Sequence, residues 1–291
     1  MKNGFLIINK PKGYTSRDVV NEVSKKLSIK HIGHTGTLDP IATGILILGI
    51  NNGCKVIELI TNEDKEYIAE VIVGVETDTL DSTGNILNTY NIENLTKEEV
   101  TLALNSFIGK YNQEVPKYSA IHVNGKRLYE YARNDIDIEL PKREVEIKNI
   151  KLLSLNEDTD NRYHFTFSTL VSKGTYIRSL IRDIGIKLNI PCTMNNLIRT
   201  KQGNISIEKS INLEEISEST KLIPITDILN NYPKLIVSKD LENKVKNGAI
   251  LDLEINNYLL ILNDKEELLA IYKPYAKDLK KCKPYKVFGG N

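Results

Sequence analysis

Strand-like and helix-like segments alternate along the chain at uneven intervals, and this spacing constrains the fold more than any other feature. A parallel α/β sheet needs a regular repeat of strand, helix and strand, so the uneven order favours an α+β fold. Capping boxes at Thr15 and Thr96, each followed by an apolar stripe of helical period, predict two helices. Strands are expected at Phe5–Ile8, Tyr67–Val73, Val145–Leu155 and Tyr163–Val171, and a third helix is expected at Ile177–Leu188. Ile45–Ile50 is a further apolar run.

A change of pattern after Pro224 indicates a second, smaller domain. A chain of 291 residues is long for a single domain of about 150 residues, so about two domains are expected. We predict a large domain over residues 1–230 and a small, mainly β domain over residues 231–291. The segments that indicate the second domain are a short helix at Leu241–Lys246 and strands at Tyr258–Leu262, Leu268–Tyr272 and Tyr285–Phe288.

The cysteines and the apolar runs exclude several classes of protein. The three cysteines lie far apart and form no CxxC pair, so neither a disulfide framework nor a cysteine metal site is expected. No stretch approaches the roughly 20 apolar residues of a membrane span. We therefore expect a cytoplasmic protein that makes no contact with a membrane.

The net charge of +1 argues mildly against a nucleic-acid-binding protein, because phosphate contacts require Lys and Arg. The distribution of charge matters more than its sum, and basic residues gather in two parts of the chain. Such clusters permit RNA binding, but they are also found on ordinary solvated faces. They are Lys117, Lys126, Arg127, Arg133, Lys142 and Arg143, and then Lys273, Lys277, Lys280, Lys281, Lys283 and Lys286.

Polar residues concentrate in the segment HIGHTGTLDPIATG, residues 31–44, which has the composition of a loop. Pro40 disfavours the helical region for Asp39, and the neighbouring glycines permit unusual backbone angles. We therefore expect Asp39 to project from a rigid loop, although an ordinary turn aspartate would fit the same pattern. His31 and His34 lack a third ligand at metal spacing, so no metal site is expected.

Tyr67, Tyr176 and Arg178 are further candidates for a site, and each also has an ordinary structural interpretation. Tyr67 begins a predicted strand, while Tyr176 and Arg178 flank a turn from strand to helix in KGTYIRSL. Arg178 could instead pair with Asp183 on the surface. Spacing alone does not show that these residues meet Asp39.

Four segments carry more specific motifs: Gly4–Ser16, Gly33–Gly44, Tyr118–Arg133 and Ser172–Ser179. Through them the chain resembles, over essentially its whole length, the bacterial TruB family, the tRNA pseudouridine-55 synthases. The resemblance implies a pseudouridine synthase fold, with a mixed, largely antiparallel central sheet flanked by helices. It also implies that the C-terminal domain is a short RNA-binding domain of the PUA type.

The resemblance further implies that the chain isomerises the T-loop uridine of tRNA to pseudouridine, with Asp39 as the catalytic carboxylate. By the same resemblance His34, Tyr67, Tyr176, Arg178 and Leu197 bind the substrate, and residues 112–145 form an insertion that grips the T-arm. The reaction oxidises nothing and adds no group, so neither a cofactor nor a metal is expected. A monomer is expected as well.

Six basic residues are expected to contact RNA. Two other functions remain open. The first is a non-catalytic RNA-binding or tRNA-folding protein on the same scaffold, and the second is a nucleotide-dependent enzyme that uses the glycines of the loop. The six residues are Lys10, Lys55, Lys126, Arg127, Arg133 and Arg199.

Overall fold

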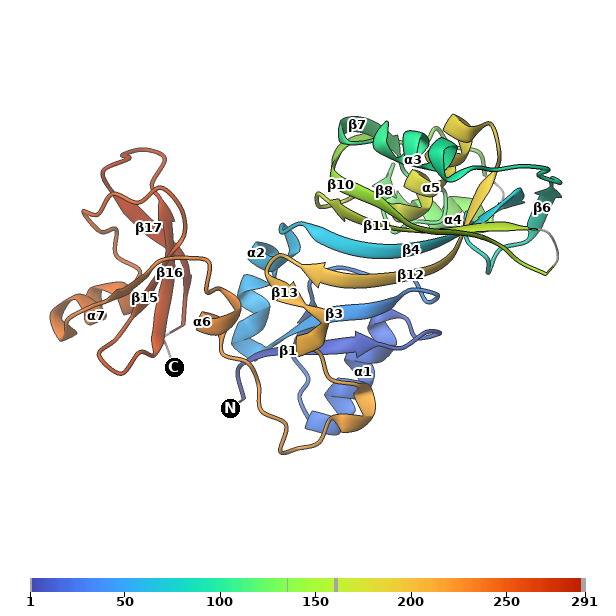
Figure 1. The fold of residues 1–291 in the computed structure, drawn as a ribbon. Coiled ribbons are helices and arrows are strands. Elements are labelled where there is room, and N and C mark those ends of the chain that lie inside the picture. The colour runs from blue at the N-terminus through green and yellow to red at the C-terminus, as the bar shows by residue number, and fades with distance from the viewer. Residues whose placement is uncertain (1, 135, 160–161, 289–291) are drawn as a thin grey trace.

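The computed structural model describes residues 2–134, 136–159 and 162–288. Within them a large sheet fills the centre of the molecule and a smaller one lies at the end that holds the C-terminus (Figure 1). The strands of the large sheet are β1 (Gly4–Lys10), β2 (Ile32–His34), β3 (Thr43–Ile50), β4 (Lys65–Val73), β7 (Gly109–Glu114), β10 (Lys142–Glu157), β11 (Tyr163–Val171), β12 (Cys192–Gln202) and β13 (Ile205–Ser206).

The large sheet is mixed and largely antiparallel, which confirms the expected fold class. Its order is β1-β3-β12-β4-β11-β10-β7, with β2 paired to β3 and β13 paired to β12. β12 runs parallel to β3 at Ile198 and Arg199, whereas the other neighbouring strands are antiparallel. The sheet therefore brings β3, β12 and β4 side by side, although long stretches of chain separate them.

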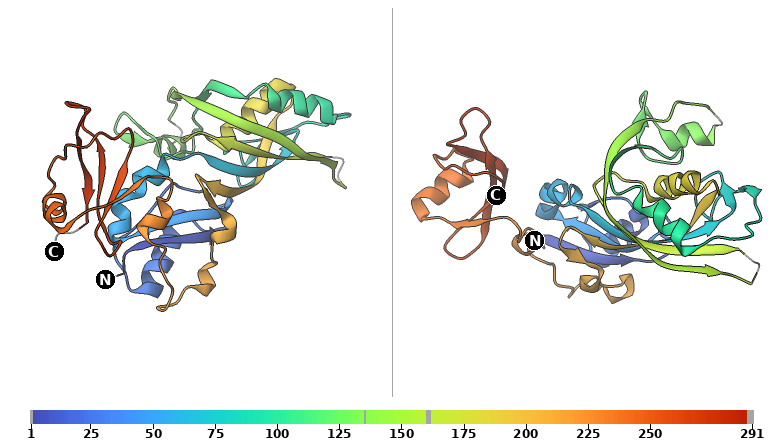
Figure 2. Two further views of the ribbon diagram at one scale, coloured as in Figure 1. Left: turned by 60° about the vertical axis from the view of Figure 1, so that its left-hand side comes forward. Right: turned by 45° about the horizontal axis from the view of Figure 1, so that its top comes forward.

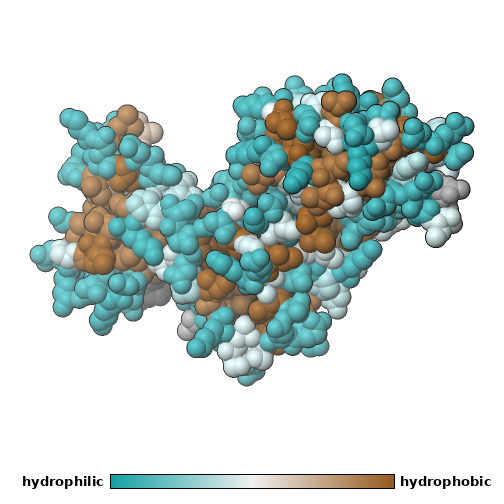
Figure 3. Space-filling view, in the orientation of Figure 1, coloured by the Kyte–Doolittle hydropathy of each residue, from teal (hydrophilic) through white to brown (hydrophobic). Residues whose placement is uncertain are grey.

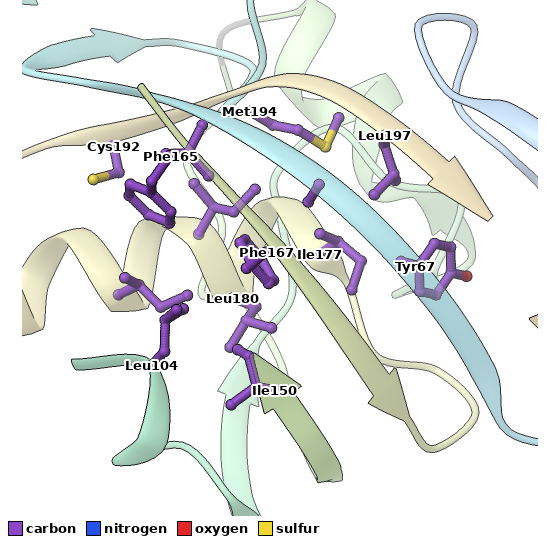
Figure 4. Packing of buried hydrophobic residues seen from close by; sticks show 14 of the residues in the cluster. Tyr67, Leu104, Ile150, Phe165, Phe167, Ile177, Leu180, Cys192, Met194 and Leu197 are labelled. Carbon is purple, nitrogen blue, oxygen red and sulfur yellow. The ribbon is translucent and has the colours of Figure 1, made fainter. Parts of the chain in front are cut away.

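Helices α3 (Lys97–Asn105) and α5 (Ile177–Leu188) cover one face of the sheet. Leu104 and Leu180 are completely buried against Phe165 and Phe167, which point inward from β11 (Figure 4). Helix α3 ends at Asn105, and the chain then turns into β7. This apolar cluster fixes the position of the N-terminus of α5.

Helix α1 (Ser16–Leu27) packs on the part of the sheet formed by β1 and β3. Both predicted capping boxes are present, at Thr15 for α1 and at Thr96 for α3. Short elements fill the remaining connections: η1 (Asn51–Val56), α2 (Ile57–Thr61), β5 (Val75–Thr77), β6 (Ile86–Thr89), η2 (Ile207–Lys209), η3 (Leu213–Glu215) and α6 (Ile225–Ile228).

The segment between β7 and β10 stands off from the sheet, as the green part of the right-hand view in Figure 2 shows. It contains the ribbon of β8 (His122–Val123) and β9 (Lys126–Arg127), followed by α4 (Leu128–Arg133). The buried apolar residues of α4 are Leu128 and Ala132. Because β7 ends at Glu114 and β10 begins at Lys142, the predicted insertion over residues 112–145 includes the last residues of β7 and the first residues of β10.

The C-terminal sheet has the order β14 (Lys234–Ile236), β15 (Leu259–Leu262), β16 (Leu268–Pro274) and β17 (Cys282–Val287), and α7 (Lys239–Lys246) packs against β16 and β17. Leu260 and Ile271 of this sheet share one buried apolar cluster with Phe5 and Ile45 of the large sheet. Hydrophobic surface remains visible on the C-terminal sheet (Figure 3). Among the described residues, no helix has the length and apolar character that crossing a membrane requires.

Candidate active site

Asp39 lies in the loop between β2 and β3, and hydrogen bonds hold the residue on each side of it. The Ser16 hydroxyl, at the start of α1, accepts a hydrogen bond from the Leu38 N–H at 2.9 Å. The Pro40 carbonyl accepts one from the Gly13 N–H at 2.8 Å. The turn after β1 and the first turn of α1 therefore fix the backbone that carries the Asp39 carboxylate.

Two buried basic residues also brace this loop. Lys10 Nζ donates to the carbonyls of Tyr14 at 2.6 Å and Pro40 at 3.4 Å. Arg199 Nε donates to the Ile45 carbonyl at 2.8 Å. Lys10 and Arg199 are 0% and 1% exposed, and their charged groups are used on backbone carbonyls. Both charged groups are thus bound within the protein, and Arg199 also lines the cleft over Asp39; the expected contact of these two residues with RNA stays a prediction.

Burial next to a catalytic candidate also changes the chemistry of Lys10. Desolvation lowers the pKa of Lys10 from 10.5 to about 8, and the nearby Asp39 carboxylate opposes this shift. The Lys10 ammonium is therefore a buried positive charge close to Asp39.

Gly44 lets β3 and β12 approach closely beside the loop. Its φ is +95°, and a Cβ at this position would lie 2.3 Å from the Arg199 carbonyl oxygen. No side chain is compatible with that distance, so only glycine fits. The contact sets the buried Arg199 behind the loop that carries Asp39.

Arg178, the second residue of α5, holds the Asp39 carboxylate through two contacts. Its Nε lies 2.9 Å from Oδ2 and its Nη2 lies 3.2 Å from Oδ1. The remaining N–H groups donate to the carbonyls of Thr79 and Tyr118, each at 3.0 Å. Asp183, the other partner considered for Arg178, pairs instead with Arg182 of α5. Since 6% of the Arg178 side chain is exposed but 36% of that of Asp39, the carboxylate stays open to a ligand.

Asp81, which was not among the predicted site residues, is a second carboxylate beside Arg178. It is 5% exposed, and its Oδ2 lies 3.8 Å from Arg178 Nη1. Its Oδ1 accepts hydrogen bonds from Thr79 Oγ1 at 3.0 Å and from the Thr83 N–H at 3.1 Å. The turn-forming composition of DTLDSTG, residues 78–84, was the available signal. Arg178 is therefore held between two carboxylates.

A cleft of about 720 Å³ opens over Asp39, and Tyr67, Tyr176, Arg178 and Leu197 line it together with Asp39. Tyr67 and Leu197 come from neighbouring strands and are 7% and 6% exposed. Figure 4 shows Tyr67 at the edge of the apolar cluster near Leu197, with its hydroxyl pointing away from the cluster. Burial raises the pKa of the Tyr176 phenol above its usual value. The structure thus brings together five residues from four separate parts of the sequence.

His34 does not line the cleft. It is the last residue of β2, a strand that forms where only a loop was predicted. Its Nδ1 accepts a hydrogen bond from the Gly36 N–H at 3.4 Å. Burial lowers the pKa of His34, with Arg199 as a smaller cause. The imidazole is therefore biased toward its neutral form beside the loop.

The other basic candidates lie in two separate regions. Lys126, Arg127 and Arg133 are exposed on the insertion, where both arginines lie over the ring of Tyr129, at 5.8 and 5.3 Å from its centroid. Tyr129 lines the cleft. Lys55 instead donates to the Val287 carbonyl of the C-terminal sheet.

Three further basic residues line the cleft and were not predicted as site residues: Lys65, Arg143 and Lys173. Lys65 donates to backbone carbonyls, and burial lowers its pKa to about 8. Arg143 and Lys173 reach the Gly174 carbonyl and the Asn62 side chain. A polyanion that entered the cleft would meet these positive charges at its wall.

The geometry suits chemistry that needs one oriented carboxylate beside a planar ring. The guanidinium of Arg178 fixes the carboxylate through both oxygens, as bidentate Arg–carboxylate pairs do. Tyr67 and Leu197 offer a stacking and an apolar surface next to it. The cleft can therefore hold an aromatic base against Asp39.

Solved structures with the same architecture show how this chain is folded. One is an H/ACA RNP bound to a substrate RNA containing 2′-deoxyuridine, with 22% identity and a TM-score of 0.72 over 99% of this chain and 85% of that chain. Another is a Cbf5–Nop10–Gar1 complex, with 23% identity and a TM-score of 0.72 over 100% of this chain and 84% of that chain. At these identities the likeness shows the fold alone.

Sequence relatives give the family. The model of the TruB family pseudouridylate synthase N-terminal domain matches residues 24–177. The tRNA pseudouridine synthase B of Bacillus subtilis strain 168 is 38% identical over 302 residues, covering 99% of this chain and 98% of that protein. The enzyme of the same name from Shouchella clausii is 37% identical over 295 residues, covering 98% of each. The chain belongs to the TruB family of pseudouridylate synthases and is an RNA pseudouridine synthase.

Proposed function

We propose that this chain converts the T-loop uridine of tRNA into pseudouridine, with Asp39 as the catalytic carboxylate. The relatives named tRNA pseudouridine synthase B support tRNA as the substrate. One observation carries the catalytic assignment: the Asp39 carboxylate is held through both oxygens by the buried Arg178 and opens into a cleft lined by Tyr67. Pseudouridine formation breaks a C–N glycosidic bond and makes a C–C bond, and it needs such an acid group at the junction of sugar and base.

The target uridine must first leave the RNA stack, which costs a few kcal/mol. Stacking on Tyr67 returns about 1–3 kcal/mol of this cost. Leu197 and Tyr176 complete the wall around the base, and His34, next to the Asp39 loop, contacts the RNA beside the target nucleotide. The closed site excludes water, which strengthens the ion pair between Asp39 and Arg178.

The test is the substitution Asp39→Asn, which keeps the size of the side chain and removes its charge. Release of tritium from tRNA labelled at C5 of uridine should fall by about 10⁴-fold or more, because the reacting group is lost. Affinity for tRNA should change by less than about threefold, since the carboxylate repels phosphate and contributes little to binding.

Asp64→Asn is the matched control, because Asp64 is also an ion-paired aspartate, bound to Lys148 at 2.6 Å outside the cleft. It should turn over at nearly the wild-type rate. Substantial turnover by Asp39→Asn would remove Asp39 from its role. An inactive wild-type protein that still refolds tRNA would favour the non-catalytic function instead.

We also propose a division of the chain into a catalytic domain over residues 1–230 and a PUA-like RNA-binding domain over residues 231–291. The separate four-stranded sheet of the C-terminal part supports this boundary. We propose that the chain acts as a monomer. Action on tRNA is consistent with a cytoplasmic location.

A further inference from the structure

Gln113 is a completely buried residue of β7, and its side-chain amide holds the backbone of Tyr176 on both sides. Its Oε1 accepts a hydrogen bond from the Tyr176 N–H at 2.8 Å, and its Nε2 donates to the Tyr176 carbonyl at 3.1 Å. Nε2 also donates to the Tyr111 hydroxyl at 2.6 Å. Because a backbone N–H can only donate and a carbonyl can only accept, these contacts fix the orientation of the amide.

The residue opposite Gln113 on β10 holds the same turn. Gln113 pairs with Arg143 in the antiparallel register, so the two side chains lie on one face of the sheet. Arg143 Nη1 contacts the Gly174 carbonyl at 3.4 Å. The two strands β7 and β10 thus hold residues 174–176 through adjacent side chains.

The position of Tyr176 determines the position of Arg178, which binds Asp39. Tyr176 is the N-cap of α5, and its side chain does not cap the helix. Arg178, two residues later, binds Asp39. A change in the backbone at the N-cap would turn the first residues of α5, so it would move both the Tyr176 ring and the Arg178 guanidinium.

We propose that Gln113 is a positioning residue of this active site: its amide fixes the N-cap of α5 to β7 and thereby orients Tyr176 and Arg178 toward Asp39. The proposal rests on the proposed function and adds a residue to it. The insertion lies between β7 and β10. Gln113 therefore connects the strand that leads into the insertion with the helix that carries Arg178.

The substitution Gln113→Glu tests the hydrogen-bond pattern directly. A neutral carboxyl group can donate to the Tyr176 carbonyl and accept from its N–H, as the amide does, whereas a carboxylate can only accept. Burial and the Tyr176 carbonyl would raise the pKa of the new carboxyl group, so it would become neutral as the pH falls. Acid should therefore restore both contacts with the Tyr176 backbone, since the single O–H of the acid can donate to the Tyr176 carbonyl while the other oxygen accepts from the Tyr176 N–H.

The charged and titratable groups around this position come from three elements. The Tyr111 phenol on β7 stays neutral, because burial raises its pKa, and Arg143 on β10 would oppose the rise expected for a carboxyl group at position 113. Burial raises the pKa of Asp183 on α5, where Arg182 pairs with it. These groups are unchanged in every variant, so a ratio of variant to wild-type rates isolates position 113.

The experiment measures single-turnover pseudouridine formation on saturating tRNA across mildly acidic to mildly alkaline pH. Gln113→Leu, which has similar volume but no amide, should turn over about 10- to 100-fold more slowly, while its affinity for tRNA changes by less than about threefold. For Gln113→Glu the ratio to the wild-type rate should rise by about tenfold as the pH falls, and it should fall again when the same sample is returned to high pH.

Asn105→Asp, which also replaces an amide by a carboxyl group but at an exposed position at the end of α3, is the control. Its ratio to wild type should be flat with pH. Wild-type turnover by Gln113→Leu would overturn the proposal, as would a Gln113→Glu ratio that does not rise in acid. Reversibility in one sample excludes a misfolded fraction as the cause. An inactive wild-type protein, in contrast, would count against the proposed function itself.

Discussion

The loop that carries Asp39 and the insertion between β7 and β10 are built in opposite ways. Buried groups on β1, α1 and β12 bind the loop from several sides, including Lys10, Ser16 and Arg199. The insertion is bound mainly to itself, as by the hydrogen bond from the Tyr131 hydroxyl to the Val123 carbonyl. Lys126, Arg127 and Arg133 on the insertion are exposed, whereas Lys10 and Arg199 behind the loop are buried.

The difference separates two tasks of positive charge. Behind the loop, cations bind backbone carbonyls and keep one carboxylate in place. On the insertion, cations remain free to meet phosphate, where contacts position the RNA without reading its sequence. Substitutions in the loop should therefore change the rate of the chemical step, and substitutions in the insertion should change affinity and its dependence on salt.

The largest effect after that of Asp39 is expected for Arg178→Lys. Lysine keeps the charge, but it cannot hold both Asp39 oxygens and two backbone carbonyls at once. Turnover on saturating tRNA should fall by about 100-fold, because the carboxylate loses its fixed orientation. Arg182→Lys, on the same helix and also paired with carboxylates, should change turnover by less than about threefold. Equal losses in the two variants would mean that the contacts of Arg178 with Asp39 have no special role in turnover.

A smaller effect is expected at Tyr67, which combines the two tasks by stacking on RNA inside the catalytic cleft. Tyr67→Ala should weaken tRNA binding by about 10-fold or more, and Tyr67→Phe, which keeps the ring, by less than about threefold. Fluorescence titration with tRNA measures both. Tyr163→Ala removes a half-buried strand tyrosine elsewhere and should leave the affinity unchanged. Equal damage from Tyr67→Phe and Tyr67→Ala would show that the hydroxyl matters more than the stacking face.

The smallest effect on catalysis is expected when Lys126, Arg127 and Arg133 are replaced together by alanine. Each lost phosphate contact should reduce the slope of log K against log salt by about 0.7–0.9, with turnover on saturating tRNA nearly unchanged. Replacement of the exposed Lys25, Lys97 and Lys187, which lie on other helices, should leave the slope as it is. A steep loss of saturated turnover in the insertion variant would mean that its cations also support the chemical step.

Much of the fold could be predicted because apolar periodicity and capping boxes are local signals. β7 and β12 were not predicted, and both place polar side chains at inward positions. Gln113 on β7 and Thr193, Arg199 and Gln202 on β12 are buried and bonded to backbone or side-chain groups. A strand whose inward residues are polar shows no alternation of apolar residues, so the sequence gives no sign of it.

The site could be predicted only in part, for a related reason. Asp39 and Arg178 are 139 residues apart, so their contact depends on the order of strands in the sheet and not on any local pattern. Only the resemblance to the TruB family predicted that Asp39 and Arg178 belong to one site. Asp81 and Gln113 were missed because a turn carboxylate and a polar strand residue both have ordinary structural interpretations.

The apolar cluster that joins the two sheets has a practical consequence for anyone who shortens the chain. Removing the C-terminal sheet would remove Leu260 and Ile271 from this cluster. Phe5 on β1 and Ile45 on β3 would then be exposed to water. β3 leads directly out of the Asp39 loop, so a truncated protein would lose stability close to its reaction centre. Weak activity of such a fragment would then report on damaged folding as much as on lost contacts with RNA.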